Sequence, residues 1–143
     1  MLGASYSFQR SRYLASESLT SLFSGKTAEG LREVPNSPNH GGSVRGAAPI
    51  LGRALLLTSR LTAEAPRWDR NDVDGSPPQG RTQPALLWDV VLSGSEARWG
   101  LSYALGLYNA FDTRWTVPLS TEFRQTKIVQ NGRTVLASAG LTF

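Results

Sequence analysis

The sequence predicts an all-β protein, an antiparallel up-and-down segment of a transmembrane β-barrel with about six strands and therefore an incomplete barrel. Three observations lead to this class. Apolar and polar residues alternate with a period of two in several stretches, and the 14 Gly and 8 Pro residues supply many turns. The connections between the stretches alternate between long and short. The chain also contains no run of about 18 apolar residues, which excludes a membrane-spanning helix.

The last stretch, Thr134 to Phe143, shows the clearest alternation. Its odd-numbered residues from Val135 to Phe143 are apolar, whereas small or polar residues predominate at the even-numbered positions. About ten residues is the length that a tilted strand needs to cross a bilayer. An apolar side and a small, polar side suit a wall between lipid and a wet or plugged lumen. A strand of a soluble sandwich would have a similar pattern.

Three strands are predicted in the first half of the chain. Leu2 to about Tyr13 alternates apolar residues with Gly, Ser and Gln, and Asn39 to Pro49 is a less regular stretch of small residues. Ala54 to about Trp68 places leucines on one side and two charged residues, Arg60 and Glu64, on the other. Because a dry core rarely contains unpaired charge, the second side is predicted to face a lumen.

Two more strands precede the last one. Pro84 to Ser93 alternates large apolar residues with a mixed set that includes Asp89, and Arg98 to about Trp115 alternates large residues with Gly, Ser and Ala. A carboxylate on the lumen side of a barrel wall needs a cationic partner. We therefore expect Asp89 to pair with Arg60 or Arg45.

The connections predict the orientation. Outer-membrane barrels have short periplasmic turns and long extracellular loops. If Phe143 lies at the periplasmic end, all the long connections face outward. Aromatic residues then form two girdles on the apolar side, with Trp99 and Phe143 at the inner ends and Trp88 and Trp115 at the outer ends. The predicted long loops are Ala15–Ser37, Asp69–Gln83 and Thr116 to about Lys127, and the short turns are Ile50–Arg53 and Gly94–Ala97.

Tyr108 to Trp115 resembles a known signature. Its residues, Tyr-Asn-Ala-Phe-Asp-Thr-Arg-Trp, are similar to the Asn-Leu-Phe-Asp-x-x-Tyr motif near the end of TonB-dependent outer-membrane receptors, with Ala110 and Trp115 replacing the usual Leu and Tyr. Pro35 to His40 likewise resembles an Asn-Ser-Pro-x-His stretch that leads into an earlier strand of these barrels. The matching positions of the motif and of the last strand are Asn109, Phe111, Asp112, Trp115, Gly132, Arg133 and the terminal Phe143.

The resemblance implies that residues 1–143 are the C-terminal part of a receptor β-barrel, with no plug domain and no signal peptide. The whole receptor would take up a scarce ligand, such as an iron chelate, a vitamin or a glycan, across the bacterial outer membrane. The implied partners are outer-membrane lipid and lipopolysaccharide, the barrel assembly machinery, which would recognise Phe143, and the TonB complex, which would act through the missing plug. Since about eight strands is the practical minimum for closure, we do not expect this chain to be a working transporter by itself.

Two alternatives stay open. One is another outer-membrane barrel, either a passive channel or a structural barrel assembled from several chains. The other is a soluble antiparallel binding domain. Nucleic-acid binding is not expected, although the net charge is +4, because the arginines are scattered rather than gathered on one stripe.

The sequence predicts neither an enzyme nor a cofactor site. His40 is the single histidine, cysteine is absent, and the chain has no Gly-x-Ser-x-Gly elbow. Gly25–Thr27 fails as a phosphate loop because Thr20 stands where the motif needs glycine. Asp69–Gly75 fails as an EF-hand because arginine occupies the first and twelfth ligand positions; a looser calcium site and a solvated turn both remain possible there.

Overall fold

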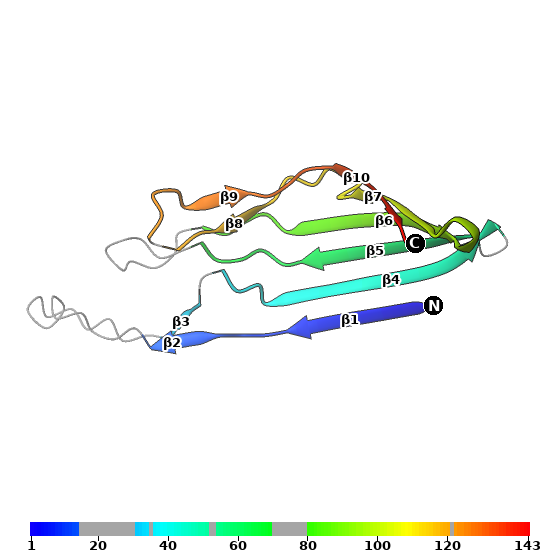
Figure 1. Ribbon diagram of the computed structural model, residues 1–143. Coiled ribbons are helices and arrows are strands. Elements are labelled where there is room, and N and C mark those ends of the chain that lie inside the picture. The colour runs from blue at the N-terminus through cyan, green and yellow to red at the C-terminus, as the bar shows by residue number, and fades with distance from the viewer. Residues whose placement is uncertain (15–30, 35, 52–53, 70–79, 121) are drawn as a thin grey trace, which may run out of the picture.

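The chain folds into one antiparallel sheet of six long strands in a single curved layer (Figure 1). The computed structural model describes residues 1–14, 31–34, 36–51, 54–69, 80–120 and 122–143. The strand order is β1-β4-β5-β6-β7-β10, so that each long strand pairs with the next one along the chain. The long strands are β1 (Leu2–Phe8), β4 (His40–Ile50), β5 (Leu55–Glu64), β6 (Ala85–Glu96), β7 (Leu101–Tyr108) and β10 (Thr134–Leu141). The predicted all-β antiparallel class is confirmed, and the sheet is open, with β1 and β10 at its edges.

Two small hairpins lie beyond the same end of the sheet (Figure 1). β2 (Arg12–Leu14) pairs with β3 (Leu31–Glu33), and β8 (Thr116–Pro118) pairs with β9 (Lys127–Val129). The opposite end has the short connections, including the 3-10 turn η2 (Ala97–Trp99). The predicted alternation of long and short connections is therefore confirmed. In the part of the chain described, no helix is long and apolar enough to span a bilayer.

Several predicted boundaries were wrong. The strand expected from Arg98 to Trp115 ends at Tyr108, because Asn109 and Asp112 take left-handed backbone angles (φ 50° and 55°) that no strand accommodates. The expected loop Thr116–Lys127 contains β8 and the start of β9. Similarly, the first and third strands are shorter than predicted, and the turn expected at Gly94–Ala97 lies later, at η2. Gly25–Thr27 lies outside the described residues.

The strand register aligns the apolar sides of all six strands. Leu57 of β5 lies opposite Leu92 of β6, which lies opposite Leu105 of β7. Because side chains alternate between the two sides of a strand, this register puts all the apolar sets on one face of the sheet. We call it the apolar face: Leu2, Ala4, Tyr6, Phe8, Val44, Ala48, Ile50, Leu55, Leu57, Leu61, Ala63, Leu86, Trp88, Val90, Leu92, Leu101, Tyr103, Leu105, Leu107, Val135, Ala137, Ala139 and Leu141.

The opposite side, which we call the polar face, carries the hydroxyl and charged residues together with small residues and a few aliphatic ones. Its polar members are Ser5, Ser7, Ser43, Arg45, Thr58, Arg60, Thr62, Glu64, Asp89, Ser93, Ser95, Ser102, Tyr108, Thr134 and Ser138.

Neither face has a hydrophobic core beneath it. Ala85 is the one buried hydrophobic residue among those described. On the apolar face, Val135 and Leu141 of the edge strand β10 are 66% and 64% exposed, and central residues such as Leu57 and Leu92 are half-buried. The remaining sheets of the described chain are the two short hairpins. A soluble sandwich needs two sheets packed face to face, and the described residues do not form one.

Candidate functional site

Asn109 is the centre of the turn that follows β7. It is 6% exposed, and its side-chain Oδ1 accepts a hydrogen bond from the Thr113 backbone N–H at 2.9 Å. Its Nδ2 donates to the carbonyl oxygens of Thr113 (3.0 Å) and Asn131 (3.2 Å). Its backbone N–H donates to Asp89 Oδ1 at 3.0 Å. The side chain of Asn109 thus ties the turn to the segment that leads into β10, and its backbone N–H ties the turn to β6.

Asp112 makes a second connection between the turn and the start of β10. Its Oδ1 accepts a hydrogen bond from the Arg133 backbone N–H at 2.9 Å. A Cβ atom at Gly132 would lie 2.8 Å from the same oxygen, closer than real contacts allow. A side chain at position 132 would therefore make this carboxylate move, and glycine permits its close approach.

Phe111 extends the apolar face beyond the ends of the strands. Its ring lies 5.4 Å from that of Trp88 between centroids, and the Ala110 N–H donates to the Trp88 carbonyl at 2.7 Å. The Thr113 hydroxyl donates to the Leu86 carbonyl at 2.6 Å. The turn is thereby fastened to the end of β6, and the Trp88–Phe111 pair supplies aromatic area at the predicted outer end.

The structure thus brings together five of the residues singled out by the motif: Asn109, Phe111, Asp112, Gly132 and Arg133. Trp115 is a correction, because it lines a hollow together with residues of the polar face and does not continue the apolar girdle. The turn at Asn109 interrupts the alternation on which that expectation depended. Phe143 lies apart from this cluster, fully exposed after the end of β10.

Two hydrogen-bond partners of Asn109, Asp89 of β6 and Asn131 before β10, were not predicted to contact it. A single carboxylate within an apolar strand was the available signal for Asp89. Asn131 acts through its backbone carbonyl, which the identity of a side chain does not reveal.

The charges of the polar face are largely paired. Arg60 Nη2 lies 3.0 Å from Asp89 Oδ2, as expected from the sequence, and Glu64 pairs with Arg67. Arg45 lies directly opposite Arg60 in the register and makes no ion pair within the described ranges. The Ser5 and Ser43 hydroxyls share a hydrogen bond of 2.9 Å. A face with charge pairs and hydroxyls suits contact with water.

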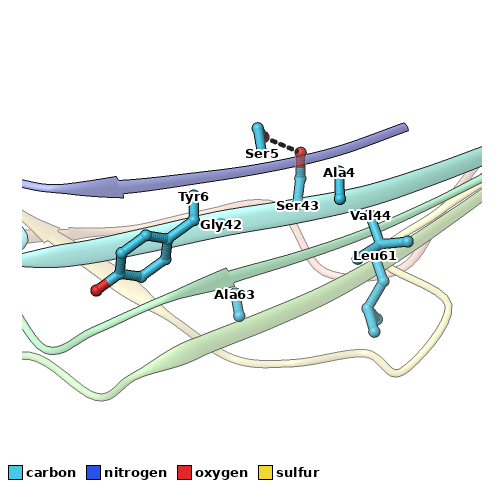
Figure 2. A pocket seen from close by; sticks show the side chains of 8 residues that line it. All are labelled: Ala4, Ser5, Tyr6, Gly42, Ser43, Val44, Leu61 and Ala63. Atoms are coloured by element: carbon cyan, nitrogen blue, oxygen red, sulfur yellow. Dashed lines mark hydrogen bonds between the residues drawn. The ribbon is translucent and has the colours of Figure 1, made fainter.

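The apolar face has a shallow hollow of about 400 Å³ between β1, β4 and β5. It exists because Ala4, Gly42 and Ala63 are small, while Tyr6, Val44 and Leu61 stand around them (Figure 2). At the predicted outer end the Tyr6 hydroxyl hydrogen-bonds to His40 Nδ1 at 2.8 Å. Aromatic rings with a polar tip are typical of the boundary between hydrocarbon and water.

Two of the long connections contact each other through an ion pair, and one of them makes an internal cation–π contact. Lys127 of β9 forms an ion pair with Asp69 at 3.0 Å, and the Arg81 guanidinium lies 3.9 Å from the ring centroid of Trp68. Most of the loop considered for calcium, residues 70–79, lies outside the described residues. Within the residues that are described, no group of three or more His, Cys, Asp or Glu side chains could hold a metal.

The fold and these contacts define the chain as an open antiparallel sheet with one apolar and one polar face. Short turns connect its strands at one end. No protein-family model, curated protein or solved structure matches the chain.

Proposed function

We propose that this chain is a wall segment of an outer-membrane transporter barrel of the TonB-dependent type, in the bacterial outer membrane. The observation that carries the proposal is the strand register, which makes one face predominantly apolar across six strands while the other is mixed and polar. The Ser59 hydroxyl in the middle of the apolar face accepts a hydrogen bond from Trp88 Nε1. In a barrel the first face contacts lipid and the second lines the bore. Charge pairs such as Arg60–Asp89 would then face water.

The three central strands, β4, β5 and β6, have 11, 10 and 12 residues and are long enough for a bilayer. The strands β1, β7 and β10, with 7, 8 and 8 residues, are shorter than the about nine residues that a tilted strand needs to cross it. β4 has 11 residues, which at about 3.4 Å per residue extend about 34 Å from first to last Cα. With the tilt of about 40° found in such barrels, the strand would cover about 26 Å along the membrane normal, close to their apolar band of about 25 Å.

The Asn109 turn supports the TonB-dependent type. The motif that resembles this family forms a buried, hydrogen-bonded connection between three parts of the wall. A whole receptor would import a scarce ligand such as an iron chelate, a vitamin or a glycan. The chain would supply wall strands, outer loops and a C-terminal signal for the assembly machinery, and the TonB complex would act through a plug. Its role is transport rather than catalysis.

A matched pair of variants tests the membrane wall. Leu57 is on the apolar face and Thr58, its neighbour, is on the polar face. The chain is targeted to the outer membrane, and the membrane-integrated fraction is compared for Leu57→Arg and Thr58→Arg. We expect a loss for the first variant, since arginine facing mid-bilayer lipid costs about 2–4 kcal/mol, and little change for the second. Equal behaviour of both variants would contradict the wall assignment.

A chimera tests the transporter type. This chain replaces the last six strands of a TonB-dependent receptor whose uptake is measurable, with an Asn109→Ala chimera as the control. We expect TonB-dependent uptake, reduced in the control. A chimera that never reaches the outer membrane would contradict the proposal.

A passive or structural barrel built from several copies is the second candidate. The open edges β1 and β10 favour it. Because the sheet has an even number of antiparallel strands, six, its two edge strands run in opposite directions. β10 of one copy and β1 of the next would therefore run antiparallel with all copies in the same orientation. A chimera that inserts and conducts solutes without TonB would favour this candidate.

A further inference from the structure

A second hollow, of about 330 Å³, opens where the polar face meets the Asn109 turn. This volume is near the lower end of the range of about 300–1,000 Å³ found for small-molecule sites. The hollow is lined from β6, β7, the turn and the approach to β10, at the end of the sheet with the long connections. Its lining includes Leu87, Tyr108, Trp115, Gln130, Asn131 and Thr134.

The lining offers no net charge to a ligand. Asp89 is the single ionisable carboxylate among the described lining residues, and both its oxygens are engaged: Oδ1 accepts from the Asn109 N–H and Oδ2 pairs with Arg60. Arginine and lysine do not occur among the lining residues that the structure describes. Since an ionic ligand loses hydration on binding and would gain no counter-charge from this lining, a neutral ligand is favoured.

Four lining side chains have unused hydrogen-bonding groups. The amides of Gln130 and Asn131, the Tyr108 hydroxyl and the Trp115 indole N–H make no hydrogen bond to any residue of the described chain. Amides and a phenol both donate and accept. The Tyr108 and Trp115 rings and the Leu87 side chain add apolar surface beside these groups.

We propose that this hollow binds a neutral sugar unit of a glycan. A sugar ring has apolar C–H faces, which pack on aromatic rings, and a rim of hydroxyls that donate and accept, as the two amides do. The inference builds on the proposed function, in which the polar face lines the bore, and it names the ligand class. Carboxylate-bearing chelates are disfavoured, because the lining provides no free cation.

The test is binding of the detergent-solubilised chain to a printed array of neutral and acidic glycans. We expect retention on at least one neutral glycan. Trp115→Ala should raise the apparent Kd at least about tenfold, equivalent to about 1.4 kcal/mol. Trp99 is an exposed tryptophan at the other end of the sheet, and Trp99→Ala should leave the Kd unchanged.

A second pair of variants guards against misfolding. Gln130→Ala should weaken binding to the same glycan, and Gln83→Ala, an exposed glutamine outside the hollow, should leave it unchanged; circular dichroism verifies the strand content of each variant. Retention on no neutral glycan, retention on acidic glycans alone, or equal losses in each variant and its control would overturn the inference. If the proposed membrane wall itself is wrong, the separate insertion experiment will show it, because Leu57→Arg and Thr58→Arg will then have equal membrane-integrated fractions.

Discussion

Replacing Asn109 by alanine should be among the most damaging single changes in the described chain. The substitution removes three side-chain hydrogen bonds, two with the backbone of Thr113 and one with that of Asn131. It also places alanine, which has a β-carbon but no polar side-chain group, at a backbone φ of 50°. Because the site is 6% exposed, water cannot fully replace the lost partners.

The magnitude follows from these two losses. Three hydrogen bonds at a net value of about 1 kcal/mol each amount to about 3 kcal/mol, and a left-handed alanine adds about 1–2 kcal/mol. Asn109→Ala should therefore lower the free energy of unfolding by about 4–5 kcal/mol. Asn109→Gly keeps the backbone angle accessible and should lower it by about 3 kcal/mol, because it loses the hydrogen bonds alone.

The assay is urea unfolding of the detergent-folded chain, followed by tryptophan emission and by amide exchange at Thr113 and Arg133. Asn131→Ala is the matched control, since that residue contributes its backbone carbonyl and its side chain makes no hydrogen bond. The reasoning would be refuted if the free energies of unfolding of Asn109→Ala and Asn131→Ala differed by less than about 1 kcal/mol. The three hydrogen bonds together would then contribute less than one ordinary hydrogen bond.

Two further predictions concern packing and charge. Gly94→Ala should lower the free energy of unfolding by about 1 kcal/mol, the low end of the cost of overpacking. Its Cβ would lie 2.6 Å from the Tyr103 ring, which is partly exposed and can turn away. In the control Gly46→Ala the nearest atoms are 3.8 Å away, and equal urea midpoints for the two variants would count against this packing. Arg60→Gln should cost under about 1 kcal/mol, since the arginine side chain is 58% exposed. A double-mutant cycle with Asp89→Asn should show a coupling that shrinks at high salt, and a salt-independent coupling would show that the pair is not screened.

The faces of the sheet were predictable from the sequence, because alternation has a simple physical cause. Leucines at 55, 57 and 61 with Arg60 between them permit one consistent assignment of sides. A slip of one residue against β6 would put Arg60 among the residues opposite Trp88, so the pattern also restricts the register. The sequence left open whether Arg60 or Arg45 pairs with Asp89, and the register chooses Arg60.

The turn at Asn109 was not predictable from alternation. Phe111 and Trp115 share the odd-numbered parity of the large residues in β7. The pattern therefore indicates a longer strand and places Trp115 on the wrong face. The left-handed angles at Asn109 and Asp112 are within the preferences of Asn and Asp, but those preferences are too weak to end a strand by themselves. The tertiary hydrogen bonds of Asn109 and Asp112 decide the outcome.

The most direct test of the central claim is a single-cysteine spin-label scan of β5, residues 55–64, in lipid bilayers. The chain has no cysteine, so each introduced cysteine carries the one label, and β5 has a paired strand on both sides. The two-faced wall predicts that labels at the odd positions collide mainly with oxygen dissolved in the lipid, and labels at the even positions mainly with a water-soluble nickel complex. Odd positions shielded from both reagents, as in a soluble core, or equal access of the nickel complex to both sets, would contradict it.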